Sequence, residues 1–332
     1  MRAIVGLVAA ALLVSACTSG GGHSNVHASS APSSTSAQSA AVAASTSTKP
    51  AKSVPVHVSL KISDGQTVGV GLPYIAFFDK KITDGRAFAQ ATKVTVNGSP
   101  ADARWYFEYS DPVSGHVMEA HLRMAKYWPA HASIHVSIAA EGKSGGVVPN
   151  QPNAQYTFTN SVTSNFATGD ARIAVVYDST HSITVLDDGK VWGTFPVSLG
   201  ADHTPTRRGF KVIMEQLPTV CMRDSQGTYH LCGVKYDSRL TYDGEYLHAA
   251  PWNCIGPPGC TGRENNIGRA DSSNGCTNLL PADAVKLFNF LRVGDVINYP
   301  DADGPRMQLG DGYGDWNVTW PLWVTGGAVP TS

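Results

Sequence analysis

The feature that most constrains the fold is a regular succession of short apolar segments separated by turn signals. The first, Val56 to Ile62, alternates apolar and polar side chains, which is the pattern of a half-buried strand, and an Asp-Gly turn follows it. Similar segments lie at residues 74–78, 93–96, 104–109, 117–124, 133–138 and 155–159. About seven strands at this spacing predict a small β-sandwich of immunoglobulin-like type.

A second group of strands begins at Ala171. Residues 171–177 and 182–186 are apolar, and an Asp-Gly turn leads to a third strand at 191–197. The one clear helix signal comes late, at residues 281–291, where apolar residues recur at helical spacing behind a proline. We therefore expect a mainly β chain, in which the immunoglobulin-like domain precedes a second β domain with one or two short helices.

The N-terminal residues indicate export. A positive start at Met1-Arg2, an apolar run from Ala3 to Val14 and small residues before Cys17 form a secretory signal that is too short to span a membrane. The small residues resemble a bacterial lipoprotein cleavage box, which implies a signal peptide at residues 1–17 and a lipidated Cys17. The protein would then be anchored to the outer face of the cytoplasmic membrane. An ordinary signal peptide cleaved near Ala16 is the alternative.

Composition predicts the remaining organisation. Residues 18–53 are rich in Ser, Ala and Thr and predict a disordered tether, because they cannot bury enough apolar area to offset their ordering entropy. We place the two domains at residues 54–162 and 163–300, and a tail at 301–332 that packs on them. We expect Pro321 to interrupt any helix there, and core packing is favoured for the tail's tryptophans over a sugar-stacking surface. The net charge of −1, without a basic run, argues against nucleic acid as a partner.

Two segments carry reactive residues. Ser273 to Asn278, read Ser-Asn-Gly-Cys-Thr-Asn, places Cys276 on a glycine turn, and Tyr246 to Trp252 supplies His248. A thiol attacks as its thiolate, and a nearby imidazole is the usual base. The pattern predicts acyl transfer through a thioester, with the amides of Gly275 and Cys276 as an oxyanion hole.

These segments, together with Thr204-Pro205-Thr206 and the terminal Gly314 to Trp320, resemble the L,D-transpeptidase family of peptidoglycan cross-linking enzymes. The first β domain likewise resembles the immunoglobulin-like modules of mycobacterial members. The resemblance implies a β-sandwich catalytic domain in which Cys276 attacks a donor tetrapeptide at the diaminopimelate carbonyl and D-alanine leaves. An amine of a second stem then resolves the thioester, which gives a 3→3 cross-link without any cofactor.

The resemblance also assigns individual roles. It implies that Cys276 is the nucleophile, that His248 is its base and that the Ala249 carbonyl orients the ring. The family pattern has histidine directly before Gly-Cys, whereas this chain has Asn274, which cannot take a proton at neutral pH.

Further residues are candidates for substrate binding. Tyr236 and Tyr242 lie in the region where the family has a substrate-covering flap, with core packing as the alternative for each. Arg269 is a candidate partner of a substrate carboxylate. Ser273 and Asn278 are candidates on the cysteine loop, where Asn278 would brace the loop by side-chain hydrogen bonds.

The number of cysteines indicates which of them are paired and which is free. Six cysteines less the lipidated Cys17 leave an odd number, so at least one stays free or pairs with another chain, and Cys276 is the natural free one. Local pairing then predicts the disulfides Cys221–Cys232 and Cys254–Cys260, although other connectivities stay open. The competing interpretation is a metal site formed by Cys254, Cys260, His248 and Cys276, which the proline and glycine between the first two disfavour.

Three functions stay open at this level. The first is a monomeric L,D-transpeptidase that acts on peptidoglycan stem peptides and meets the membrane only through its lipid. The second is an L,D-carboxypeptidase that transfers the acyl group to water at the same site. The third is a catalytically weakened peptidoglycan-binding lipoprotein, in which Asn274 marks lost chemistry. For the immunoglobulin-like domain, a spacer is favoured over a substrate-binding module.

Overall fold

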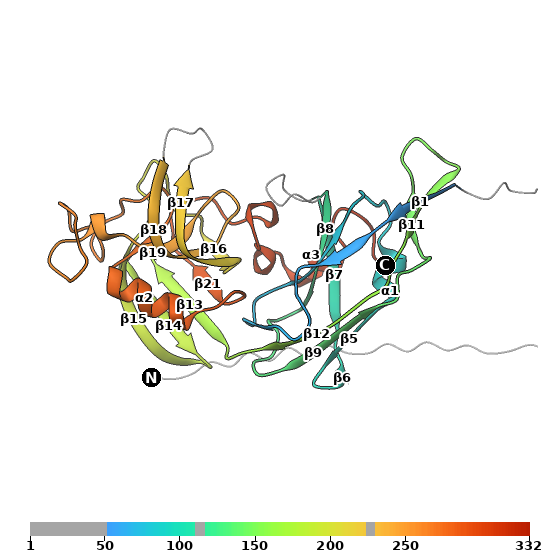
Figure 1. Cartoon of the computed structure of the whole chain (residues 1–332), viewed down its shortest axis with the longest axis horizontal. Coiled ribbons are helices and arrows are strands. Elements are labelled where there is room, and N and C mark those ends of the chain that lie inside the picture. The colour runs from blue at the N-terminus through green and yellow to red at the C-terminus, as the bar shows by residue number, and fades with distance from the viewer. Residues whose placement is uncertain (1–51, 110–116, 224–229) are drawn as a thin grey trace, which may run out of the picture. The chain divides into compact units, whose positions relative to one another are not determined.

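The computed structural model describes residues 52–109, 117–223 and 230–332 (Figure 1). The predicted signal peptide, Cys17 and nearly all of the predicted tether lie outside these residues. In the described part of the chain, no helix has both the length and the apolar character that a membrane crossing requires.

The described residues up to 168 form the immunoglobulin-like domain. Two facing sheets have the strand orders β2-β4-β8-β7 and β3-β12-β9-β5-β6, and a smaller sheet has the order β1-β11-β10. The elements are β1 (Lys52–Val56), β2 (Val58–Leu60), β3 (Thr67–Val68), β4 (Tyr74–Phe78), α1 (Arg86–Gln90), β5 (Thr92–Val96), β6 (Ser99–Pro100), β7 (Ala103–Glu108), β8 (Met118–Met124), β9 (Ser133–Ile138), β10 (Ser144–Val147), β11 (Ala154–Phe158) and β12 (Val162–Thr168).

An aromatic cluster fills the core of this domain. Phe88 of α1 is fully buried, and its ring centroid lies 5.1 Å from that of Phe78, 5.2 Å from that of Trp105 and 5.4 Å from that of Phe158. The described part of the domain contains no disulfide, so apolar burial of this kind has to stabilise it.

The second domain is built on one continuous sheet with the order β16-β21-β13-β14-β15-β20-β19-β18-β17. Its elements are β13 (Arg172–Tyr177), β14 (Ser182–Asp187), β15 (Lys190–Ser198), β16 (Gly209–Val212), β17 (Glu215–Arg223), β18 (His230–Arg239), β19 (Tyr246–Ala249), η2 (Pro251–Asn253), β20 (Thr277–Leu279), α2 (Pro281–Phe290) and β21 (Val296–Tyr299). Helix α2 begins at Pro281, where no backbone N–H is needed, and buries Ala284 and Leu287 against β18 and β19. The sheet and this helix enclose the second core.

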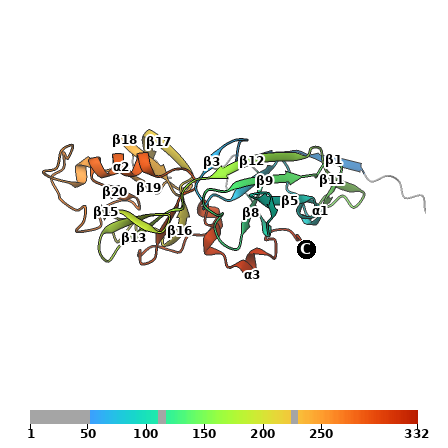
Figure 2. The same ribbon diagram turned by 90° about the horizontal axis from the view of Figure 1, so that it is seen from below.

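The segment after β21 returns to the first domain. It contains η3 (Leu309–Asp311), η4 (Asp315–Asn317) and α3 (Trp320–Trp323), and Figure 2 shows α3 beside the strands of the immunoglobulin-like domain. The indole N–H of Trp316 donates to the Gly71 carbonyl over 2.8 Å, and that of Trp323 donates to the Arg104 carbonyl over 2.8 Å. The Asn317 side chain accepts a hydrogen bond from the Phe210 amide of β16 at 2.9 Å. This C-terminal segment therefore contacts both domains.

Several strands agree with the sequence pattern, and two features differ from it. The expected strands at 74–78 and 133–138 coincide with β4 and β9. The expected strand at 56–62 is divided at His57, because β1 pairs with β11 while β2 pairs with β4. The first domain also continues past residue 162, since β12 pairs with β9 and β3.

The expectation that Pro321 excludes a helix was wrong. Pro321 lies in the first turn of α3, where its missing N–H leaves no helical hydrogen bond unmade. Trp323 of that helix is fully buried, in agreement with a packing role.

Candidate active site

The cysteine and the histidine singled out in the sequence lie at neighbouring strands. Strand β19 pairs in parallel with β20, in a register that sets Leu247 beside Thr277 and His248 beside Asn278. Cys276 directly precedes β20, and its sulfur accepts a hydrogen bond from the backbone N–H of Tyr246. Sheet pairing therefore brings together two residues that are far apart in the sequence.

Gly275 and Ser273 set the conformation of the cysteine loop. Gly275 has φ of 102°, a left-handed conformation that residues with a Cβ rarely adopt. Its amide donates to Ser273 Oγ over 3.1 Å, and Ser273 Oγ donates in turn to the Cys276 carbonyl over 2.6 Å. The Gly275 carbonyl accepts a hydrogen bond from Thr206 Oγ1 at 2.9 Å. Because the Gly275 amide is already engaged, it is not the free oxyanion donor that the sequence analysis expected.

The Cys276 thiol lies in an apolar environment. The residue is 7% exposed and packs with Met222, Val234 and Tyr246. Burial raises the pKa of the thiol to about 12, against the opposing effect of the Tyr246 amide. Cys276 is therefore a neutral thiol. Its S–H donates a hydrogen bond to the Gly244 carbonyl oxygen, with 3.6 Å between the sulfur and the oxygen.

His248 is held in one tautomer. Its Nδ1 lies 2.9 Å from the Ala249 carbonyl oxygen, which can only accept, so Nδ1 carries the proton and Nε2 keeps its lone pair. Burial lowers the pKa of His248 to about 4, which keeps the ring neutral. The Trp252 ring lies near it, with 5.8 Å between the ring centroids. The structure therefore has a neutral imidazole at His248 and a neutral thiol at Cys276, on neighbouring segments of the sheet.

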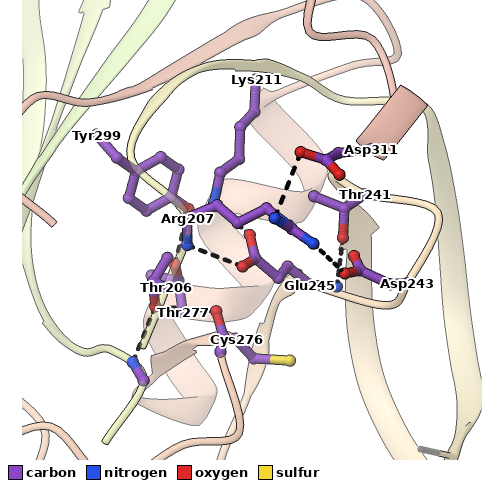
Figure 3. A network of polar contacts seen from close by, with 12 residues as sticks. Thr206, Arg207, Lys211, Thr241, Asp243, Glu245, Cys276, Thr277, Tyr299 and Asp311 are labelled. Carbon is purple, nitrogen blue, oxygen red and sulfur yellow. Dashed lines mark hydrogen bonds and ion pairs between the residues drawn. The ribbon is translucent and has the colours of Figure 1, made fainter. Parts of the chain in front are cut away.

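A buried ion pair adjoins the thiol, as Figure 3 shows. Lys211 is fully buried and donates to Glu245 Oε2, while the other oxygen of Glu245 accepts from the Arg207 amide at 2.9 Å. Burial lowers the pKa of Lys211 and raises that of Glu245, so each charge depends on the other. Their charges act on Cys276 in opposite directions, since Glu245 raises the pKa of the thiol and Lys211 lowers it.

The pair is part of a larger polar network. The Arg207 guanidinium binds Asp243 at 2.7 Å and Asp311 at 3.4 Å. The Lys211 ammonium lies 3.9 Å from the centroid of the Tyr299 ring. The Tyr299 hydroxyl is 2.7 Å from Oγ1 of Thr277, which directly follows Cys276. The network therefore extends from Asp243 and Asp311 to Thr277.

Asp237 is a second buried charge that the sequence analysis missed. Its side chain is fully buried, and neither carboxylate oxygen has a hydrogen-bond partner among the described residues. Burial raises the pKa of Asp237 to about 7, and its charge in turn raises the pKa of Cys276.

The remaining candidates are dispersed around the site. Asn274 and Arg269 are exposed, and the Arg269 amide donates to the Asn266 carbonyl. Asn278 is buried, but its Oδ1 has no partner in the described structure, so this oxygen does not brace the loop as expected.

The two candidate tyrosines pack away from the thiol's apolar cluster. Tyr236 meets the Phe288 ring edge-on at 5.8 Å, and Tyr242 meets the Tyr313 ring edge-on at 6.4 Å. The aromatic residue that packs with Cys276 is Tyr246. It stands two residues before His248 in one strand, so strand periodicity could have identified it.

Both disulfides favoured from the sequence are present. Cys221–Cys232 connects β17 to β18, and Cys254–Cys260 closes the loop after η2. Cys276 is the free cysteine of the described residues. The competing metal site is not formed, because Cys254 and Cys260 are bonded to each other.

Known proteins are similar to both domains of this chain. The family model of the L,D-transpeptidase catalytic domain matches residues 171–298, and that of a bacterial Ig domain matches residues 22–144. L,D-transpeptidase 1 of Mycobacterium tuberculosis is 30% identical over 257 residues, which are 75% of this chain and 86% of that protein. L,D-transpeptidase 2 of the same species is 28% identical over 289 residues, and the match spans 83% of this chain but 64% of that protein's length. The solved structure of the LD transpeptidase LdtMt1 in complex with imipenem has a TM-score of 0.55 at 29% identity, covering 73% of this chain and 97% of that one.

The buried pair generates a stability prediction. Lys211→Met leaves Glu245 charged and unpaired, and we expect it to lower the free energy of unfolding by about 3–5 kcal/mol, measured by denaturant titration. The double variant Lys211→Met/Glu245→Leu should regain most of that loss. Lys286→Met, which removes an exposed partner of Asp283, serves as the control and should cost less than about 1 kcal/mol. If Lys211→Met and Lys286→Met lowered the free energy of unfolding by the same amount, Lys211 and Glu245 would not form a buried ion pair that stabilises the fold.

Asp237 generates a pH prediction. Its folded pKa of about 7 lies above the value of about 3.9 in an unfolded chain, so the folded protein binds this proton more tightly. The stability of the native protein should therefore fall, relative to Asp237→Asn, as the pH rises from about 4 to about 7, by about 1.4 kcal/mol for each unit of pKa difference. Parallel stability curves of the two proteins across this range would show that Asp237 does not titrate as described.

Proposed function

Because this chain belongs to the L,D-transpeptidase family, we propose that it forms 3→3 cross-links between peptidoglycan stem peptides through a thioester on Cys276. The observation that carries the proposal is the placement of the free thiol of Cys276 beside the strand of His248, whose tautomer the Ala249 carbonyl fixes. The proposed donor is a tetrapeptide stem, and the proposed acceptor is the side-chain amine of a second stem.

The first half-reaction forms the thioester. Cys276 Sγ attacks the diaminopimelate carbonyl of the donor, and the thiol proton passes to Nε2 of His248. The tetrahedral intermediate collapses with cleavage of the bond to D-alanine, whose amine takes the proton from His248. The pKa of the thiol is about 12 and that of the imidazole about 4, so the neutral pair has a much lower free energy than the thiolate–imidazolium pair. Proton transfer therefore accompanies the attack instead of preceding it.

The second half-reaction reverses the roles. The acceptor amine attacks the thioester, His248 removes its proton, and the thiolate of Cys276 leaves and is reprotonated. Attack by water in place of the amine would make the protein an L,D-carboxypeptidase.

The proposed reaction does not require a histidine at position 274. The side chain is exposed and stands where the family has a second histidine, whereas His248 is buried and oriented. The geometry therefore supports His248 as the base and favours an active enzyme over a weakened binding protein.

Imipenem tests the nucleophile directly. We expect the intact mass of the protein to increase by one drug molecule, and Cys276→Ala to remain unmodified. His248→Gln should slow acylation by about 10²–10⁴-fold, which is the usual contribution of a general base. Asn274→Ala is the matched control and should stay within a few-fold of the native rate. Acylation that survives in Cys276→Ala, or that needs Asn274 more than His248, would contradict the site.

Incubation with stem tetrapeptides then separates the reactions. Cross-linked dimer with released D-alanine supports the transpeptidase. Release of D-alanine alone selects the carboxypeptidase, and neither product selects the binding lipoprotein.

We also propose that Cys17 carries a lipid that anchors the protein to the outer face of the cytoplasmic membrane. The small residues before Cys17 support this proposal. Cys17→Ala should abolish labelling by a fatty acid analogue in cells and release the protein from the membrane fraction. Labelling that persists in this variant would refute lipidation at Cys17.

A further inference from the structure

A buried cluster of acidic residues and one histidine lies in the immunoglobulin-like domain, on the face of β8 opposite its apolar core residues. Glu119 and His121 alternate with Met118, Ala120 and Leu122, so the first two share one face of the strand and the other three share the core face. Residues Glu119 and His121 are 3% and 1% exposed. This polar face is therefore as buried as the apolar one.

Sheet register brings a second glutamate into the cluster. Glu108, at the end of β7, is the cross-strand partner of Glu119, and Tyr106 is that of His121. Sheet register therefore places the two glutamates next to each other and close to His121.

The three side chains converge with the spacing of metal ligands. His121 Nε2 lies 3.4 Å from Glu108 Oε1 and 3.9 Å from Glu119 Oε1. One ligand atom from each residue can be chosen so that all three lie within 4.8 Å of one another. Bonds of 2.0–2.2 Å to a tetrahedral zinc ion set neighbouring ligands about 3.4 Å apart, which is close to the observed spacing.

Asp315 of the C-terminal segment orients the histidine. Its Oδ1 lies 2.8 Å from His121 Nδ1 and accepts the proton there, which directs Nε2 toward the two glutamates. Nε2 has no hydrogen-bond partner among the described residues, although the side chain is buried. A carboxylate that holds the far nitrogen of a histidine is the usual support of a metal-ligating imidazole.

Arg123 shares the face of Glu119 and His121 on β8, and its guanidinium lies 4.7 Å from the centroid of the Trp316 ring and 4.1 Å from that of the Trp323 ring. The C-terminal segment that supplies Asp315 therefore also packs on this face of the strand.

We propose that Glu108, Glu119 and His121 bind one zinc ion, with Asp315 as the orienting partner of His121. Glu108 is the most exposed of the three ligands, with 12% of its side chain accessible, so a water molecule completes the coordination on that side. The ion would join β7 and β8, and through Asp315 it would tie the C-terminal segment to the immunoglobulin-like domain.

The test is a zinc titration of metal-stripped protein carrying Cys276→Ala, which removes the free thiol as a competing ligand. We expect one equivalent of Zn²⁺ by calorimetry and a higher Tm when the ion is bound. Glu108→Gln and His121→Asn should abolish this binding, and Asp315→Asn should weaken it by about 10–100-fold. His131→Asn alters an exposed histidine between Asp170 and Asp188 and should leave it unchanged.

Near-ultraviolet circular dichroism of the stripped variants provides the folding control. Glu108 lies at the strand end and is partly accessible, so Glu108→Gln decides the question if His121→Asn fails to fold. The proposal is overturned if no equivalent of Zn²⁺ binds, or if the folded Glu108→Gln variant binds it as tightly as its parent. Loss of binding in His131→Asn alone would assign the ion to the exposed cluster and would equally overturn the proposal.

Discussion

The parallel pairing of β19 with β20 is the interaction on which the candidate site depends. Parallel neighbours require a crossover connection, and here residues 250–276 supply it, with helix η2 and the Cys254–Cys260 loop inside it. The crossover ends at Gly275 and Cys276. The connection that allows the parallel pairing therefore also places the thiol next to β19, the strand that contains His248. A change in this register would separate the two residues even if both were retained.

Around this pairing, the domain buries charge next to a neutral thiol. Glu245 and Asp237 disfavour the thiolate, and Lys211 and the Tyr246 amide favour it. Together with burial, which is the largest effect, these charges leave the Cys276 thiol protonated. This arrangement limits reaction of the thiol with small electrophiles, which a preformed thiolate would not.

The fold class followed from the sequence, because strand periodicity is local, and the cysteine count correctly singled out Cys276 as the free thiol of the described residues. The charged residues near Cys276 did not follow from the sequence. Lys211 lies within an otherwise apolar strand and Glu245 precedes another, and only their tertiary pairing shows that both are buried. The role of Gly275 was half predicted: a glycine turn was expected there, but the engagement of its amide by Ser273 depends on loop geometry. The division of one expected strand at His57 likewise depends on which sheets are available on either side.

The return of the C-terminal segment to the first domain has a consequence for the order of folding. Trp316 and Trp323 cover the polar face of β8, yet they follow the whole second domain in the sequence. During synthesis, the first domain can complete its apolar core early, but His121 and Arg123 lack their contacts with Asp315, Trp316 and Trp323 until the second domain has been made. The polar face of β8 is therefore covered last, and a chain interrupted in the second domain would leave this charged face of the strand exposed.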